Sequence, residues 1–287
     1  MTDLRASGRE QVADWIETSL LVRGTRQLGL DRLHRIALDE VGAGPAAVSL
    51  AIRVMSRRGA VLGDHYPFEV SDVAVRARPT APEATYSGLL LMTPDSPARQ
   101  VAGADPPTGT ILLFERIAVA AAIAMLGPSG RAVRFGWPSD EGRPPEFAYA
   151  IEWLAGLMGI KPGSAYRPPR RRDGGVDVVA WRPFPDGRSG FPVMLVQCTL
   201  QHDILPKAGD IDVRYWAGWL TLDADPMVAL AVPQTIPQGV VWDELALRSL
   251  VLERVRLAGL APVAPGVTAF VSDMIGTLSR HLTAAEA

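Results

Sequence analysis

Two short apolar runs on either side of a turn place the strongest constraint on how this chain folds. The runs Val176–Trp181 and Val193–Cys198 are dominated by valine and other residues that favour strands. The segment Pro185–Gly190 between them contains proline, aspartate and glycine, which favour turns. The pattern therefore predicts a β-hairpin, in which successive side chains point to opposite faces.

Polar residues gather at the open end of this hairpin. Counting outward from the middle of the turn places Asp177 opposite Cys198, and it puts Gln197 and Thr199 on one face. Asp177 joins that face if the register is shifted by one residue. Carboxylate and amide oxygens are hard ligands of the kind that magnesium accepts. The end of the hairpin is therefore a candidate metal site.

The remainder of the chain predicts helices and a few further strands around the hairpin. Apolar residues recur at three- and four-residue spacing and favour helices over Glu10–Leu21, Leu30–Val41, Pro45–Arg58, Thr110–Leu126, Phe147–Met158, Val213–Leu222, Trp242–Leu257 and Thr268–Leu282. Strands are expected within Tyr66–Arg78 and over Met227–Val232, and a first core strand is expected around Ser164–Arg167. The order of helices and strands indicates an α/β fold.

A cluster of prolines before the helix at Thr110–Leu126 marks a boundary, because prolines at this spacing interrupt helices and central strands. We place the boundary near residue 105. We therefore expect a helical and mixed accessory region over 1–105, the core over 106–235 and C-terminal helices over 236–287. A chain of 287 residues is long enough for one large domain or two smaller ones.

Composition excludes several classes of protein. A hydrophobic fraction of 48%, a charged fraction of 21% and a net charge of −2 are typical of soluble globular proteins rather than disordered ones. The single cysteine, Cys198, excludes an internal disulfide framework and a multi-cysteine zinc site. The first residues show no signal peptide, and apolar runs such as Ile117–Leu126 are shorter than a membrane-spanning helix. We therefore expect a cytoplasmic protein outside the membrane.

The residues at the hairpin end resemble a known family. The segment Asp173–Asp177, with the sequence DGGVD, is followed one hairpin later by Val196–Cys198, with the sequence VQC. Together they resemble the Mrr-like restriction endonucleases of the PD-(D/E)XK superfamily, whose signature is D-G-G-hydrophobic-D and then a strand ending Q-x-K. The resemblance covers Phe147–Val232, and Phe147–Gly159 resembles the first core helix of the family. It implies a restriction-endonuclease-like core, with a mixed sheet flanked by helices.

The resemblance also implies an active site that depends on Mg²⁺ or Mn²⁺. Asp177 and Gln197 are the expected metal ligands and catalytic residues, and the bound ion would polarise a phosphodiester and activate water. A further acid is expected from Glu115, Glu146 or Glu152. The implied activity is therefore the hydrolysis of phosphodiester bonds in DNA.

The chain departs from the family pattern at two positions. Ala148 stands where the family has a glutamate on its helix, and Thr199 stands where it has the catalytic lysine. Only two of the 29 basic residues are lysines, Lys161 and Lys207. Lys207 follows the hairpin and is the candidate replacement for the missing catalytic lysine, although a solvated surface lysine is an equally good interpretation.

Arginines near the hairpin are candidates for binding nucleic acid. Arg170, Arg171 and Arg172 immediately precede the DGGVD segment, and Arg182 lies on the hairpin. They could give a basic cleft mouth despite the negative net charge, or they could form an ordinary solvated surface. The N-terminal region would recognise DNA or a partner protein, or form a homodimer.

Two functions follow from these observations. The first is a metal-dependent DNA endonuclease of restriction or anti-phage type. The alternative is a catalytically inactive nuclease-fold subunit with a structural or sensing role in a defence complex, bound to partner proteins of the same defence operon. The alternative accounts directly for Thr199 and Ala148.

Overall fold

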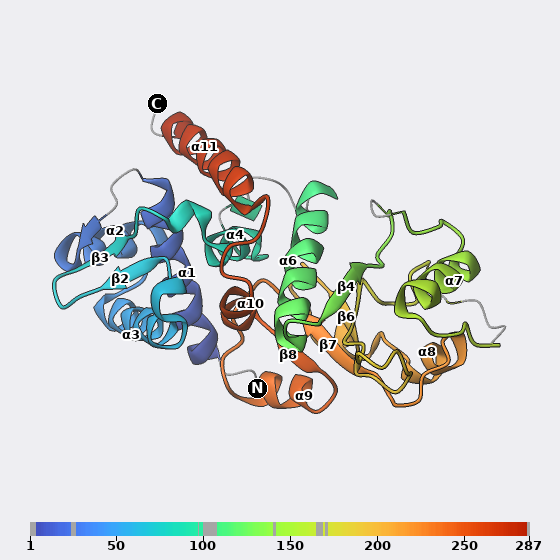
Figure 1. The fold of residues 1–287 in the computed structure, drawn as a ribbon. Helices are drawn as coiled ribbons and strands as arrows, with labels where there is room; N and C mark the ends of the chain where they lie inside the picture. The colour runs from blue at the N-terminus through green and yellow to red at the C-terminus, as the bar shows by residue number, and fades with distance from the viewer. Residues whose placement is uncertain are drawn as a thin grey trace. The chain divides into compact units, whose positions relative to one another are not determined.

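A computed structural model describes residues 4–23, 27–96, 98–99, 108–139, 142–164, 169 and 172–285 of the protein. The chain forms two compact units, whose elements are drawn in Figure 1. The first unit comprises Met1–Leu113, Pro233–Val240 and Glu253–Ala287, and the second comprises Phe114–Val232 and Val241–Leu252. The segment 236–287, expected as one set of helices, therefore contributes to both units.

The first unit begins with three helices and a small sheet. Its elements in chain order are α1 (Leu4–Val22), β1 (Gln27–Gly29), α2 (Leu30–Val41), α3 (Pro45–Leu62), β2 (Phe68–Val70) and β3 (Ala74–Ala77). The three strands are antiparallel in the order β1-β3-β2. The helices expected in this region and the strands expected within Tyr66–Arg78 are thus confirmed.

A short buried helix and two C-terminal helices complete the first unit. They are α4 (Thr85–Met92), α10 (Arg254–Leu260) and α11 (Val267–Ala285), with short 3₁₀ turns η1 (Gly63–His65) and η2 (Ala81–Glu83). Every residue of α4 is buried. The expected helix over Trp242–Leu257 is wrong, because the chain there forms a helix, a strand and a second helix. Periodicity alone does not distinguish a short buried strand from a helical segment.

A buried network of charges holds the first unit together. The guanidinium group of Arg254 is fully buried and donates hydrogen bonds of 2.8 and 2.7 Å to the two carboxylate oxygens of Asp14. Arg58 donates to Asp14 at 2.8 Å and to Glu17 at 2.9 Å. The hydroxyl of Tyr66 donates to Glu17 at 2.6 Å. Buried charges require such partners, so α10 is tied to α1 and α3 by these contacts.

The second unit contains a five-stranded mixed sheet. Its strands are β4 (Arg131–Arg134), β5 (Val178–Trp181), β6 (Val193–Cys198), β7 (Met227–Ala231) and β8 (Leu250–Leu252), in this spatial order. The β4–β5 and β5–β6 pairs are antiparallel, and the β6–β7 and β7–β8 pairs are parallel. The α/β class with a mixed sheet flanked by helices is thus confirmed.

The first strand of this sheet is β4, although the sequence pattern favoured a strand around Ser164–Arg167. Residues 165–168 lie outside the part of the chain that the structure describes. β4 pairs with β5 over its whole length, so that Arg134 lies opposite Val178. The edge beside the hairpin is therefore taken by a segment from earlier in the chain.

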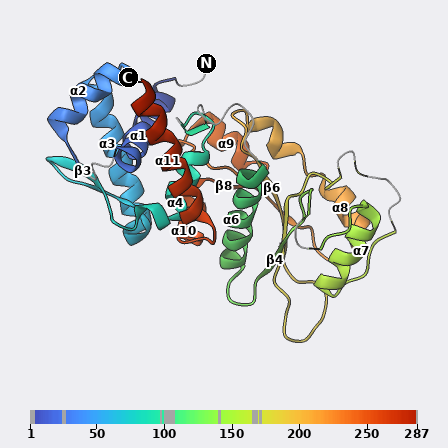
Figure 2. The same cartoon turned by 90° about the horizontal axis from the view of Figure 1, so that it is seen from above.

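Helices cover both faces of this sheet, as Figures 1 and 2 show. These helices are α6 (Thr108–Leu126), α7 (Phe147–Met158), α8 (Val213–Trp219) and α9 (Val240–Ala246), and a 3₁₀ turn, η3 (Leu205–Gly209), precedes α8. Val179 and Leu195 pack with residues of α7 and α8 in one hydrophobic cluster. Because side chains alternate along strands, Val178 and Val196 point to the opposite face, on which α6 lies.

The register of the hairpin differs by one residue from the count that placed Asp177 opposite Cys198, and it is the alternative that the sequence left open. Val178 pairs with Val196 and Trp181 pairs with Val193. Continuing this register by one residue places Asp177 opposite Gln197 rather than opposite Cys198. The length of the loop between the strands does not fix the register, which is why the two alternatives were open.

One helix among the described residues is long and apolar enough to cross a membrane by length and composition. It is the window Gly109–Leu126 of α6, with a mean hydropathy of 1.9, half of which is buried. The core helix of a soluble protein has the same properties. This helix also carries a buried glutamate, Glu115, which pairs with Arg134.

Candidate functional site

Two carboxylates face each other across a glycine that follows β4. Asp177 immediately precedes β5, and Glu115 lies on α6. A β-carbon at Gly136 would lie 3.0 and 3.2 Å from the two carboxylate oxygens of Glu115 and 3.3 Å from Asp177 Oδ1. These distances are shorter than an ordinary van der Waals contact. Gly136 therefore lets two acidic groups from distant parts of the chain approach the same small space.

The amide of Gln197 lies beside the carboxylate of Asp177. Asp177 Oδ2 accepts hydrogen bonds from the backbone N–H of Cys198 at 2.7 Å and from Gln197 Nε2 at 3.3 Å. With the amide nitrogen facing the carboxylate, Gln197 Oε1 is buried and has no hydrogen-bond partner among the described residues. A buried acceptor without a partner is costly. A turn of the amide by 180° would exchange the two atoms and bring this oxygen, in place of the nitrogen, toward a cation beside Asp177.

The electrostatics of the site favour a proton or a cation. The pKa of Asp177 is raised to about 8, chiefly by burial and next by the nearby negative charge of Glu115. The hydrogen bond from the Cys198 backbone N–H and the charge of Lys207 act in the opposite direction on this pKa. Two neighbouring carboxylates cannot both be ionised cheaply. A divalent cation between them would remove the repulsion and favour the ionised form of Asp177.

The residues present fit a magnesium site. Two carboxylates and one amide oxygen are the hard oxygen ligands that magnesium prefers, and this ion usually keeps several waters. Among the described residues no three His, Cys, Asp or Glu side chains gather closely enough to hold a metal ion. The third protein ligand would therefore be the amide oxygen of Gln197, beside Asp177 and Glu115.

Of the three candidate additional acids, the structure brings only Glu115 to Asp177. Glu146 precedes α7 and Glu152 lies within it, and both side chains are exposed. The helix Phe147–Met158 lies between β4 and β5 in the chain and contributes apolar residues to the core. Glu115 lies on α6, so the helix over Phe147–Gly159 does not bring either of its candidate acids to Asp177.

Arg134 is a site residue that sequence reasoning missed. One guanidinium nitrogen lies 2.6 Å from Glu115 Oε2, and both side chains are buried. The other terminal nitrogen donates to the carbonyl of Pro138. Arg134 thus fixes the carboxylate of Glu115 and partly neutralises it. Nothing in the sequence distinguishes this arginine from the many others in the chain.

Lys207 lies in η3 and acts on the site electrostatically. Its Nζ is 3.4 Å from Asp210 Oδ2, and its charge lowers the pKa of Asp177. A β-carbon at Gly175 would lie 2.9 Å from the carbonyl oxygen of Asp210. The glycines of the DGGVD segment therefore allow the chain around Lys207 to approach the start of β5.

The two other residues of the expected motif have structural roles. Asp173 Oδ1 accepts a hydrogen bond of 2.8 Å from the backbone N–H of Gly175 and stabilises the turn before Asp177. Thr199 is buried, and its hydroxyl accepts a hydrogen bond of 3.2 Å from the backbone N–H of Gln201. Position 199 therefore supplies no cation.

The candidate nucleic-acid-binding arginines are not all in one place. The Arg172 guanidinium lies 5.7 Å from the ring centre of Trp137, which is next to Gly136 in the chain, and Arg172 is exposed. Arg182 follows the far end of β5, roughly 16 Å from Asp177 at the usual rise of a strand. Arg170 and Arg171 lie outside the described residues.

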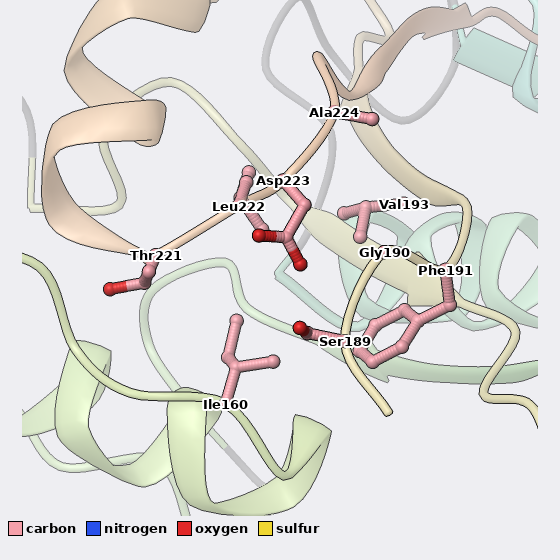
Figure 3. A pocket seen from close by; sticks show the side chains of 9 residues that line it. All are labelled: Ile160, Ser189, Gly190, Phe191, Val193, Thr221, Leu222, Asp223 and Ala224. Carbon is pink, nitrogen blue, oxygen red and sulfur yellow. The ribbon is translucent and has the colours of Figure 1, made fainter. Parts of the chain in front are cut away.

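A small surface depression lies at the other end of the hairpin. It is partly open to solvent and is lined by Ile160, Ser189, Gly190, Phe191, Val193, Thr221, Leu222, Asp223 and Ala224 (Figure 3). Asp223 is its only charged side chain. None of the candidate site residues lines it, so this depression is distinct from the carboxylate pair.

Comparisons with protein-family models, with curated proteins and with solved structures found no match.

Proposed function

We propose that the second unit is a divalent-cation-dependent nuclease that hydrolyses phosphodiester bonds in DNA. The convergence of Glu115 and Asp177 at Gly136, with the Gln197 amide beside Asp177, carries this proposal. When bound, Mg²⁺ or Mn²⁺ supplies a Lewis acid for the phosphate and lowers the pKa of a bound water. The protein residues hold the ligand oxygens in place and keep the two carboxylates close together.

The order of the elements supports a restriction-endonuclease-like core. A helix, α6, and a strand, β4, precede the β5–β6 hairpin, and η3 and α8 then lead to β7, which is parallel to β6. Apart from α7, which lies between β4 and β5 in the chain, the order is therefore helix, strand, hairpin, helix and strand around a mixed sheet. The resemblance of Asp173–Asp177 and Gln197 to the Mrr-like signature supports the same assignment.

Lys207 is the proposed replacement for the missing catalytic lysine. It lies in η3, its charge lowers the pKa of Asp177, and Asp210 holds its ammonium group at 3.4 Å. An ammonium group there would orient the attacking water or stabilise the developing charge on the phosphate. Arg172, which is exposed and lies 5.7 Å from the ring centre of Trp137, would contact the DNA backbone.

The alternative is a catalytically inactive nuclease-fold subunit of a defence complex. Its specific support is the short ion pair between Arg134 and Glu115, which already neutralises one of the two carboxylates. The pairing of Lys207 with Asp210 points the same way, because it engages the one lysine near the site. Under this alternative the site would bind a cation weakly or not at all.

A plasmid-nicking assay separates the two functions. Wild-type protein is expected to nick supercoiled plasmid in Mg²⁺ or Mn²⁺, whereas Asp177→Ala and Glu115→Gln should abolish nicking. Glu152→Gln is the matched control, because it changes an exposed carboxylate on α7 in the same way. Nicking that survives Asp177→Ala would refute the site. A wild-type protein that cleaves no DNA in either cation would favour the inactive subunit.

The proposal extends to the setting of the protein. We propose a cytoplasmic restriction or anti-phage role away from the membrane, with two copies of the chain needed for a cut in both strands. Phage plating on cells that express the wild type or Asp177→Ala tests this role. Equal plating on both would contradict it.

A further inference from the structure

The first unit contains two helices joined by a tight turn. α2 ends at Val41, and three residues, Gly42 to Gly44, lead to α3 at Pro45. Gly42 has a φ of 65°, and the backbone N–H groups of Gly42 and Ala43 bond to the carbonyl oxygens of Leu38 and Ala37. A glycine-containing turn of this length is the connection found in helix-turn-helix motifs.

The sheet follows the helices as a short hairpin. α1, β1, α2 and α3 precede β2 and β3, and β3 pairs with both β1 and β2. Figure 2 shows α1, α2 and α3 gathered together with this hairpin beside them. This is a helix-turn-helix with a hairpin appended, an arrangement in which the second helix of the motif is available for binding.

One face of α3 is packed and the other is open. The buried residues of α3 are Val48, Ala51, Val54, Met55, Arg58 and Leu62. The opposite face is exposed at Ser49, Leu50, Arg53, Ser56 and Arg57. These positions recur at three- and four-residue spacing, so they form a stripe along the helix. An α-helix of 18 residues is long enough to lie along a groove of duplex DNA.

The charge of the open stripe is positive. The α3 sequence contains three arginines and no acidic residue. Among the described residues, neither Arg53 nor Arg57 forms an ion pair with a carboxylate. Arg58, by contrast, forms ion pairs within the buried network. Two arginines without a carboxylate partner among the described residues are suited to phosphates and base edges, because each guanidinium group donates several hydrogen bonds.

We infer that the first unit binds double-stranded DNA through the open stripe of α3, with Arg53 and Arg57 as its main contacts. The docking is that of a helix-turn-helix, in which the second helix enters the major groove. The inference is independent of the nuclease proposal, since none of these residues belongs to the unit with the carboxylate pair.

The β2–β3 hairpin contributes little to this surface. Arg76 on β3 is paired with Glu69 on β2, and the second arginine of the hairpin region, Arg78, also lies near Glu69. The turn between the strands carries Asp72 and an exposed Val73. Paired arginines and an acidic tip are poorly suited to phosphate, so α3 supplies the binding charge.

Fluorescence anisotropy on the full-length protein tests the inference. The probe is a fluorescein-labelled DNA duplex of mixed sequence, about two helical turns long, and EDTA in the buffer prevents cleavage. Arg53→Ala and Arg57→Ala should each weaken binding by roughly fivefold or more, and the double reversal Arg53→Glu with Arg57→Glu should abolish it. For the double variant Arg53→Ala with Arg57→Ala, the plot of log affinity against log salt concentration should have a shallower slope, by about two released counterions.

Arg280→Ala is the matched control, because it removes an exposed arginine from α11 of the same unit. It should bind like the wild type, and circular dichroism should show that the stripe variants stay folded. Duplex binding that survives the double charge reversal overturns the inference. Stripe variants that change only self-association in sedimentation experiments, and not duplex binding, also overturn it, because the open face would then bind a second copy of the protein. Loss of nicking by Asp177→Ala with intact duplex binding would leave the inference standing separately.

Discussion

Gly136→Ala should impair the proposed cation site without removing any of its ligands. The added methyl group would lie 3.0 and 3.2 Å from the oxygens of Glu115 and 3.3 Å from Asp177 Oδ1. Gly136 does not belong to the residues with positive φ, so the backbone accepts alanine without strain. The carboxylates would have to move apart by a few tenths of an ångström.

A displacement of this size matters for magnesium. This ion requires nearly ideal octahedral geometry, with oxygen distances of about 2.0–2.1 Å. Small misplacements of reacting groups reduce rates by large factors, up to about a hundredfold for 1 Å. We therefore expect Gly136→Ala to raise the half-saturating Mg²⁺ concentration for plasmid nicking by roughly tenfold, and to lower the maximal rate.

The assay is a Mg²⁺ titration of nicking rates for three proteins. Gly156→Ala on α7 is the control, because a β-carbon there has no neighbour within 4 Å. It should behave like the wild type in both half-saturation and maximal rate. If Gly136→Ala and Gly156→Ala have the same Mg²⁺ dependence as the wild type, the cation does not lie between Glu115 and Asp177. The reasoning from this geometry would then be refuted.

Three further substitutions test other features of the structure. Asp177 has a pKa raised to about 8, so its contribution to stability is fully present below the unfolded-state pKa and is lost as the pH rises through about 8. In denaturation experiments without divalent cations, the free energy of unfolding of Asp177→Asn should therefore rise by a few kcal/mol relative to that of the wild type as the pH increases from about 5 to about 9. A difference that does not change with pH would contradict the raised pKa. Lys207→Ala should lower the maximal nicking rate more than it changes the half-saturating Mg²⁺ concentration, because a protonated amine is not a metal ligand and its Nζ pairs with Asp210; a change in the Mg²⁺ requirement alone would argue against this role. Arg254→Met should lower the free energy of unfolding by about 3–5 kcal/mol in urea, because it leaves the carboxylate of Asp14 without its bidentate partner, and a loss below about 1 kcal/mol would show that the network is not needed.

The hairpin was predictable because its signals are local. Strand-forming runs, a glycine-rich turn and polar residues at one end are all visible in Val176–Cys198. The register was not determined in this way, since one residue of loop length changes which side chains share a face. Asp177 and Gln197 were nevertheless recognised as neighbours because both alternatives keep them at the same end.

The partners of Asp177 from other elements were harder to predict. Glu115 was one of three candidate acids, and only the packing of α6 on the sheet brings it to Gly136. Arg134 was missed because a buried arginine in a short strand looks like an exposed one in the sequence. β8 was also missed, because its three residues are apolar and follow a helix, so the periodicity continued through them.

The buried network in the first unit has a consequence for how the chain folds during synthesis. Asp14 and Glu17 lie near the start of the chain, whereas Arg254 emerges about 240 residues later. Until then, one arginine, Arg58, faces both carboxylates. A truncated chain that ends at Leu113 would keep the helix-turn-helix but leave its internal charges unbalanced. The first unit therefore has segments on both sides of the second unit in the chain, and it is completed only after the whole of the second unit has been synthesised.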